Sequence, residues 1–466
     1  MNTLNDPDYE TDDELDHSDD SDSEISDIEN QSTNGNWSSQ EICPAQRLEF
    51  QKFLAETKEK GILTPPIPSL RGKNGHRWST TPPVTTKRTS ARNIVHVVRG
   101  PKAVAKNAVT PLQCWELFFS DAILNKILVH TNEKIELMAS KFQNQNATVQ
   151  KVSYNELRAL LGLLYFTAAL KDNHLSARTL FNSGLCGNQY KACLSSERFS
   201  FLLWCLRFDD SKTRDERMKT DRFAPVREVW EIFIENCRNN YKPGSFVTID
   251  EQLLAFRGRC SFRMYMPNKP AKNGIKTVMM CDTTTNYLID AIPYLGKNTN
   301  TNGMAHGEFF VKKLTESIHG SNRNVTMDNW FTSVPLALDL LKPPFNLTMV
   351  GTIRANKREI PREMLNVRKR KVDTSLVGYD RELTLTSYKA KKNKVVLLLS
   401  TMNETVKADS QTFKPDVADF YNSTKGAVDT FDQLCSLSTC NRKTPRWPNC
   451  FVYGMLNSGG INSETH

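Results

Sequence analysis

Four aspartates in this sequence are spaced so that their carboxylates could meet at one metal site. Asp250 follows the run 246–249 and Asp328 follows the run 325–327, so both stand at the carboxyl ends of predicted strands. Asp429 and Asp432 are three residues apart in a predicted helix and therefore share one helical face. Three aspartates offer the oxygen ligands with which two Mg²⁺ ions activate a hydroxyl or water and stabilise the leaving oxygen of a phosphodiester displacement.

The same aspartates also have an ordinary structural explanation. Aspartate is common after strands, where it forms turns, and at helix starts, where it acts as a cap. Glu251, Asp282 and Asp290 also end or flank predicted strands, and for these three we expect turn or ion-pair roles. Spacing alone therefore leaves both explanations of the four aspartates open.

The elements that must position these acids form an α/β pattern after residue 244. Three short β-branched or apolar runs come first, separated by turn residues, and helical and strand patterns then alternate. Three consecutive strands followed by such alternation are typical of a ribonuclease H-like core. The predicted strands lie at 245–250, 277–282, 287–294, 324–328 and 347–352, with helices at 308–318 and 334–341.

We expect this catalytic domain to span residues 245–438 and to contain an insertion. Residues 354–415 are polar and very basic, with one strong strand pattern at 394–400, which predicts an inserted β-rich subdomain. A last helix is predicted at 417–434, and it carries the third and fourth aspartates.

Residues 110–244 are predicted to form an all-helical domain. Thr110 followed by proline is a helix-start signal, because threonine caps helices and proline fits the first helical position. Ser153 and Glu156 have capping-box spacing ahead of an apolar run. Helical periodicity continues through residue 170 and returns at 194–208 and 226–237.

Charge is distributed unevenly along the 466 residues. The first thirty residues carry thirteen acidic residues and no Lys or Arg, and we expect residues 1–40 to be disordered. The formal net charge of +9 therefore leaves +22 for the remainder. Residues 71–106 hold nine basic residues and no acids, the composition of a basic arm that follows a phosphate backbone or of a plain linker. We therefore interpret 1–109 as an acidic tail and a basic arm on a body that binds polyanions.

The remaining composition argues against several protein classes. The sequence contains neither a long uninterrupted apolar stretch nor a signal-peptide pattern, so we expect an intracellular protein with no membrane partner. The eleven cysteines form no C-x-x-C pair and the eight histidines no H-x3-H pair, which argues against a disulfide framework, a zinc knuckle and a histidine metal site. We expect the cysteines to be reduced thiols.

Long motifs around the aspartates allow a sharper interpretation. They are TIDEQLLAFRGRCSFRMYMPNKPAKNGIK at 248–276, NVTMDNWFTS at 324–333, VGTIRANKREIP at 350–361, NSTKGAVDTFDQLCS at 422–436 and CNRKTPRWP at 440–448. Together they closely resemble the piggyBac DDD transposases, from about residue 110 to 457.

The resemblance implies a function, a fold and a set of site residues. The function is Mg²⁺-dependent nicking at transposon ends, hairpin formation by the freed 3′ hydroxyl and integration at TTAA targets. The fold is a ribonuclease H-like core with a β-rich insertion. The family's three catalytic, metal-binding aspartates correspond to Asp250, Asp328 and Asp429, and its supporting fourth acid corresponds to Asp432.

The resemblance also implies DNA and a second copy of the chain as partners, and a nuclear location. Residues 110–244 correspond to the first part of a helical dimerisation and DNA-binding domain, and residues 439–466 to a shortened second part. Basic residues after the first aspartate are candidates to hold phosphates, with solvated surface as the alternative for each. We expect Trp330 to pack and Trp447 to face DNA. The DNA-binding candidates are Arg257, Arg259, Lys269, Lys272, Lys276 and Trp447.

The sequence departs from the family after residue 457. The family continues with a cysteine-rich zinc-binding domain that is missing here, so we expect no zinc, weaker end recognition and weaker dimerisation. The alternative function is a catalytically silent, host-adopted or truncated DNA-binding protein. The intact aspartates favour the enzyme, whereas the shortened C-terminus favours the alternative. The basic run 368–371 is either a nuclear signal or solvated surface.

Overall fold

The computed structural model describes residues 16–17, 44–84, 88–142, 146–297 and 299–465. Among residues 1–43 the structure describes only Asp16–His17. These two residues form strand β1, which pairs in parallel with β8 (Met264–Tyr265). The predicted disorder of residues 1–40 otherwise lies outside the described residues. Among the described helices, none is both long and apolar enough to cross a membrane.

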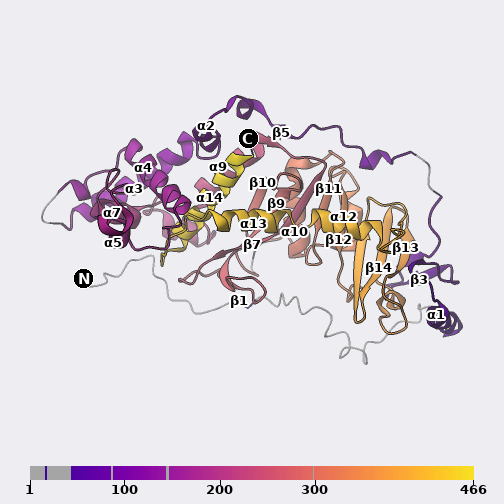
Figure 1. Cartoon of the computed structure of the whole chain (residues 1–466). Helices are drawn as coiled ribbons and strands as arrows, with labels where there is room; N and C mark the ends of the chain where they lie inside the picture. The colour runs from indigo at the N-terminus through magenta and orange to yellow at the C-terminus, as the bar shows by residue number, and fades with distance from the viewer. Residues whose placement is uncertain (1–15, 18–43, 85–87, 143–145, 298, 466) are drawn as a thin grey trace.

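A mixed sheet of thirteen strands runs through the molecule (Figure 1). Its central strands follow the order β10-β9-β7-β11-β12. β9 is antiparallel to both of its neighbours in this order, whereas β11 is parallel to both of its own. The predicted α/β class is confirmed. The bounds are β7 (Phe246–Ala255), β9 (Asn273–Asp282), β10 (Leu288–Pro293), β11 (Asn324–Met327) and β12 (Thr348–Thr352).

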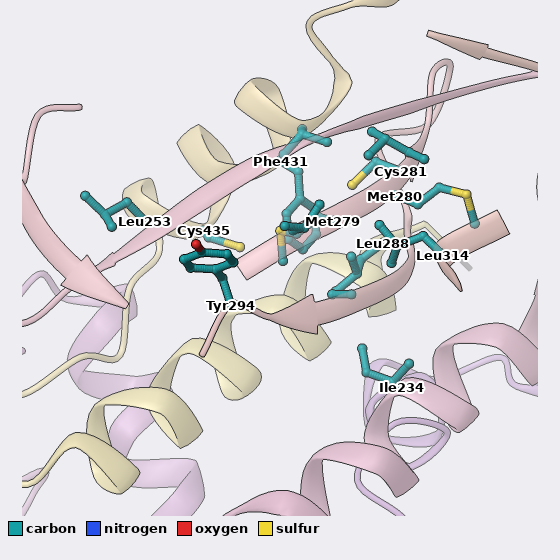
Figure 2. Close-up of a cluster of buried hydrophobic side chains, with 14 of the residues drawn as sticks. Ile234, Leu253, Met279, Met280, Cys281, Leu288, Tyr294, Leu314, Phe431 and Cys435 are labelled. Atoms are coloured by element: carbon teal, nitrogen blue, oxygen red, sulfur yellow. The ribbon is translucent and has the colours of Figure 1, made fainter. Parts of the chain in front are cut away.

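Helices pack on this central sheet and bury its strands. β9 is buried along nearly its whole length, as expected for a strand covered on both faces. Phe431 and Cys435 of α13 pack over β7 and β9, and Ile234 of α9 packs near β10 (Figure 2). The helices that cover or adjoin the sheet are α9 (Arg227–Asn240), α10 (His306–Leu314), α11 (Val334–Leu340), α12 (Asp416–Thr424) and α13 (Ala427–Leu437).

The last helix of the catalytic domain, predicted as one segment over 417–434, is two helices. α12 ends and α13 begins around Gly426. The carbonyl of Thr424 accepts a hydrogen bond from the Thr248 hydroxyl at 2.5 Å, and the Thr424 hydroxyl accepts one from Thr326 at 2.8 Å. Sheet contacts therefore hold the backbone where a helix would continue, and glycine adds little helical preference.

The insertion extends the central sheet. β12 pairs antiparallel with β15 (Lys394–Ser400), which leads to β14 (Leu383–Lys391) and β13 (Thr374–Asp380). Within residues 354–415 the structure has three strands, two more than the one strong pattern predicted. Buried positions of these strands include hydroxyl residues such as Ser387 and Thr386. These residues contribute to the polar composition of the segment and weaken its strand pattern.

The interpretation of residues 1–109 as tail and arm is wrong for residues 44–80. This segment folds onto the insertion, where β2 pairs with β13 and the β3–β4 hairpin continues the sheet. Trp78 is fully buried, and its indole N–H donates to the Glu359 carbonyl at 2.8 Å. Prolines, glycines and charged residues interrupt the apolar residues of this segment, which hid these elements in the sequence. They are α1 (Pro44–Glu56), β2 (Gly61–Leu63), β3 (Ser69–Arg71) and β4 (Arg77–Ser79).

The described residues between 110 and 240 form helices joined by loops, and the short strand β6 (Tyr241–Lys242) follows within the predicted 110–244 domain. Thr110 caps its helix in a full capping box with Gln113. Ser153 accepts from the Glu156 amide, but the Glu156 carboxylate is taken by Arg198 at 2.7 Å, so the second half of that capping box is replaced by an ion pair. The helices are α2 (Pro111–Glu116), α3 (Asp121–Ala139), α4 (Tyr154–Ala169), α5 (Ala177–Leu180), α6 (Ser183–Cys186), α7 (Ser196–Cys205), α8 (Arg214–Met218) and α9.

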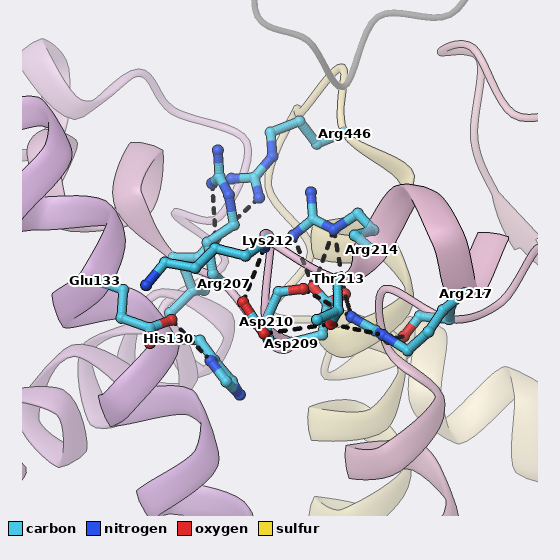
Figure 3. Close-up of polar contacts among 12 residues, drawn as sticks. His130, Glu133, Arg207, Asp209, Asp210, Lys212, Thr213, Arg214, Arg217 and Arg446 are labelled. Carbon is cyan, nitrogen blue, oxygen red and sulfur yellow. Dashed lines mark hydrogen bonds and ion pairs between the residues drawn. The ribbon is translucent and has the colours of Figure 1, made fainter.

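The C-terminal helix α14 (Trp447–Glu464) joins this helical module to the sheet. Arg446, at its start, donates to the carbonyls of Trp204 and Leu206 at 3.2 and 2.9 Å, beside the polar network around Asp209 (Figure 3). Near its end, buried Asn462 bonds both backbone groups of Leu288 in β10. Helix α14 therefore packs against α2 and α9 of the helical module as well as against β7 of the sheet.

Candidate active site

Asp250 and Asp328 lie at the same level on two neighbouring parallel strands. β7 and β11 pair in register up to Ile249 with Met327, so the next residue of each strand is one of these acids. β11 ends there, whereas β7 continues to Ala255 in pairing with β9. The strand predicted to end at Asp250 is thus longer than expected, and this acid lies where β7 extends past β11.

The carboxylate of Glu251 joins these two acids. One oxygen from each of Asp250, Glu251 and Asp328 lies within 4.8 Å of the other two, and all three residues are partly buried. We call these three residues the acidic cluster. In the part of the chain that the structure describes, no other set of three or more such residues is close enough to hold a metal ion. Sequence reasoning missed Glu251, for which adjacency to Asp250 was the available signal.

The acidic cluster strongly perturbs the titration of Asp250. Burial raises the pKa of Asp250 well above its ordinary value, and repulsion from Glu251 and Asp328 raises it further. Such crowding of carboxylates is costly in a stable fold but is common at functional sites. A divalent cation among the three side chains would relieve the repulsion.

Backbone hydrogen bonds orient two of the three acids. One carboxylate oxygen of Asp328 accepts from the amide of Trp330 at 2.9 Å, and one of Asp250 accepts from the amide of Glu251 at 2.8 Å. The carbonyl of Asp328 also accepts from the hydroxyl of Thr332 at 2.8 Å. Hydrogen bonds therefore fix both the carboxylate and the carbonyl of Asp328 in the turn after β11.

Helix α13 brings the remaining two predicted acids to the same region. Asp432 accepts from the buried amide of Gln252 at 2.9 Å, and burial raises its pKa. Asp429 is more exposed and lies outside the acidic cluster, with its Oδ1 3.7 Å from Nζ of Lys269. The structure thus brings Asp250 and Asp328 together and connects Asp429 to them through a lysine.

Two other acids near strand ends have the turn and ion-pair roles expected of them. Asp282 accepts from the backbone amides of Thr284 and Thr285 at 2.9 Å and closes the β9–β10 turn. Asp290 lies 3.4 Å from Arg238, but burial still raises its pKa to about 7.

The five basic candidates occupy three different environments. Arg257, Arg259 and Lys272 are exposed. Lys269 is partly buried within the acidic site. Lys276 is buried, with its ammonium 4.4 Å from the centre of the Trp330 ring, so it supports the turn after β11 from inside the protein and is not an exposed phosphate contact.

The two tryptophans singled out from the sequence both pack inside the protein. Trp447 stacks on Phe223 with ring centroids 5.8 Å apart and meets Phe262 edge-on at 5.0 Å. This corrects the expectation that Trp447 faces DNA, since its ring belongs to an aromatic core at the start of α14. Trp330 contacts Phe331 at 4.7 Å, which confirms the expected packing role.

Comparisons with known proteins agree on one family. Residues 110–464 match the family model described as Transposase IS4. The human "PiggyBac transposable element-derived protein 3" is 21% identical over 362 residues, covering 72% of this chain and 58% of its own length. The human "Chimeric ERCC6-PGBD3 protein" is 21% identical over 362 residues, covering 72% of this chain and 32% of its own length. The chain thus spans less than two thirds of either human relative.

A solved structure is much more similar. The cryo-EM structure of the piggyBac transposase synaptic complex with hairpin DNA shares 49% identity and a TM-score of 0.76, covering 79% of this chain and 76% of its own. With the match of the family model to most of its length, this chain belongs to the piggyBac family of transposases.

Proposed function

We propose that this chain cuts and joins DNA strands at transposon ends in a Mg²⁺-dependent reaction and integrates at TTAA targets. The observation that carries the proposal is the meeting of Asp250, Glu251 and Asp328 on neighbouring parallel strands. The likeness to a piggyBac transposase captured with hairpin DNA supports DNA as the substrate.

The proposed core is ribonuclease H-like. Its support is the strand order β10-β9-β7-β11-β12, with the first three strands antiparallel in succession and the last two parallel to β7. In such a sheet Asp250, within β7, and Asp328, just after β11, lie side by side. The insertion then continues the sheet from β12.

The ligand set fits a hard divalent cation. Asp250, Glu251 and Asp328 supply carboxylate oxygens, which Mg²⁺ prefers, and the crowding that raises the pKa of Asp250 is the repulsion that such an ion offsets. We propose Asp429 and Asp432 as further acids of the site. When bound, the metal ions would supply activation of the attacking oxygen and stabilisation of the leaving one.

The chain's own residues hold and orient this site. The Trp330 amide fixes the carboxylate of Asp328, and the buried Lys276 ammonium braces the ring of that tryptophan. Gln252 fixes Asp432, which sets the rotation of α13 and hence the side on which Asp429 lies. The exposed Arg257 is suited to hold a DNA phosphate close by.

We also propose a homodimer and a nuclear location. A piggyBac-type reaction joins two transposon ends, which calls for two active sites, and its DNA substrate is chromosomal. The basic run 368–371 supports a nuclear signal less than expected, because Arg370 is buried and donates to Thr374 and Ser387.

A second candidate function is a transposase-derived DNA-binding protein without catalysis. The observation that favours it is Asp429, whose carboxylate lies beside an ammonium and outside the acidic cluster. The two candidates share DNA binding and differ in strand cleavage.

Strand cleavage decides between them. Labelled duplexes carrying candidate transposon ends beside TTAA are incubated with the protein and Mg²⁺, and nicks and hairpins are resolved on a denaturing gel. We expect products from the wild type, none from Asp250→Asn or Asp328→Asn, and unchanged products from Asp215→Asn, which removes an exposed carboxylate on α8. Products that persist in Asp250→Asn would contradict the proposed site, and DNA binding without products would establish the second candidate.

A further inference from the structure

Lys269 is held in a closed loop between β8 and β9. Its amide donates to the Met266 carbonyl at 3.2 Å, its carbonyl accepts from the Lys272 amide at 3.0 Å, and the Met266 amide donates to the Lys272 carbonyl at 2.7 Å. These bonds fix the loop at both ends, so the side chain of Lys269 leaves the backbone from a defined position.

The ammonium of Lys269 lies between acids from two different elements. Its Nζ donates to the Glu251 carbonyl at 3.0 Å and is 4.0 Å from the carboxylate of the same residue in β7. It is also 3.7 Å from Oδ1 of Asp429 in α13. The side chain of Lys269 is 21% exposed, against 68% for that of Asp429. Solvent therefore screens the Lys269 ammonium only on its outer side.

This arrangement explains why Asp429 stays near the acidic cluster. Helix α13 brings Asp429 to this side of the sheet, where Asp250, Glu251 and Asp328 repel its carboxylate, and burial does not hold the mostly exposed side chain there. The ammonium supplies the attraction, since its charge is opposite to that of Asp429 and the two groups are 3.7 Å apart. The exposed Lys272, three residues on in the same loop, carries the same charge and provides an internal comparison.

We propose that Lys269 is a positioning residue that acts as the counter-cation of the metal-free site, holding Asp429 beside the acidic cluster until divalent cations take its place. The inference rests on the proposed metal-dependent function. Binding of the ions then frees the ammonium from Asp429. A lysine that served solely as a phosphate contact would affect DNA binding but leave metal binding in the absence of DNA unchanged.

The test measures Mn²⁺ binding and thermal stability of the full chain without DNA. Mn²⁺ affinity is read by electron paramagnetic resonance, and the melting temperature is measured in EDTA. We expect Lys269→Met to bind Mn²⁺ about five- to tenfold more tightly than wild type, because the ion no longer displaces an ammonium. The same variant should melt a few degrees lower in EDTA. Lys269→Arg should restore both values, and Lys272→Met should change neither.

The possible outcomes of these measurements distinguish a failure of this inference from a failure of the proposed function. Lys269→Met with the same Mn²⁺ affinity and the same melting temperature as Lys272→Met would overturn the counter-cation role even if metal binds. Weaker Mn²⁺ binding by Lys269→Met would overturn it as well. A third outcome is that Lys269→Met melts lower in EDTA but Asp250→Asn does not reduce Mn²⁺ binding. That outcome would contradict the metal site and still support the ion pair between Lys269 and Asp429.

Discussion

Individual residues of the site are arranged at the expense of stability. Three carboxylates share one edge of the sheet, and burial together with their repulsion raises the pKa of Asp250. Protein families keep such costly groups at functional sites, where removing them stabilises the fold at the expense of activity. The acidic cluster should therefore show this opposition between stability and function.

We predict that Asp250→Asn stabilises the metal-free protein while it abolishes cleavage. Asparagine keeps the shape of the side chain but removes a buried charge that Glu251 and Asp328 repel. An increase in melting temperature of roughly 2–4 °C in EDTA corresponds to about 1 kcal/mol in a domain of a few hundred residues. Differential scanning calorimetry of both proteins in EDTA provides the measurement, and a lower melting temperature for the variant would contradict the repulsion.

Asp290 gives a second prediction, which concerns pH. Burial raises its pKa to about 7, so between about pH 4 and pH 7 the folded protein holds a proton that the unfolded chain has released. The free energy of unfolding should therefore fall as pH rises through this window, by no more than about 4 kcal/mol. Asp290→Asn should remove this dependence and be the more stable protein at pH 8. Urea unfolding of both proteins at pH 5 and pH 8 tests this prediction. If the free energy of unfolding changes equally between the two pH values in both proteins, Asp290 is not the group responsible.

At the scale of elements, the site depends on how closely β11 and β12 approach. Gly351 of β12 pairs with Met327, the last residue of β11 and the neighbour of Asp328. A Cβ at position 351 would collide with the Thr332 hydroxyl and lie 2.7 Å from the Met327 carbonyl. Glycine is required here by close packing of the backbone that carries the acid.

Gly351→Ala should therefore push the end of β11 away from β12 and move Asp328. We expect a loss of stability of about 1–3 kcal/mol, typical of overpacking, and weaker Mn²⁺ binding. Gly426→Ala is the matched control, because nothing lies within 4 Å of its added Cβ and the position adjoins a helix start. Urea unfolding and Mn²⁺ titration should separate the two variants, and equal behaviour would show that the approach at Gly351 does not position the acid.

The elements also show what the sequence could and could not predict. The positions of the core strands were predicted because short β-branched or apolar runs are bounded by turn residues, as at Asn324–Met327, although β7 continues five residues past its predicted end. The break at Gly426 was not predictable, since it depends on hydrogen bonds from Thr248 and Thr326, which are distant in sequence. Glu251 joined the site for a similar reason, because its distance to Asp328 is set by pairing between strands. Asp429 was a candidate from its helical spacing with Asp432 and from family resemblance, but neither predicted its contact with Lys269.

At the scale of the whole molecule, one continuous sheet links the catalytic edge to the insertion and to the segment before residue 80. β12 and β15 join the core to the insertion, and β13 joins the insertion to the β3–β4 hairpin. The basic residues 71–106 therefore begin on a folded hairpin at the far end of the sheet from the helical module (Figure 1). Part of the expected basic arm is thus a rigid surface.

The hairpin and the remainder of the arm should contribute differently to DNA binding. Arg71 and Arg77 are exposed and directly opposite each other on β3 and β4, where like charges destabilise a strand pair unless an anion lies nearby. A rigid pair also loses little conformational entropy on binding.

We therefore predict that Arg71→Gln with Arg77→Gln lowers the slope of log affinity against log salt concentration by about 0.9 for each phosphate that the protein no longer neutralises. Arg88→Gln with Lys106→Gln removes the same charge from the segment after the hairpin and should change the slope less. Filter binding of both double variants to one duplex at several salt concentrations makes the comparison, and an unchanged slope for the hairpin pair alone would place the DNA path along residues 81–109.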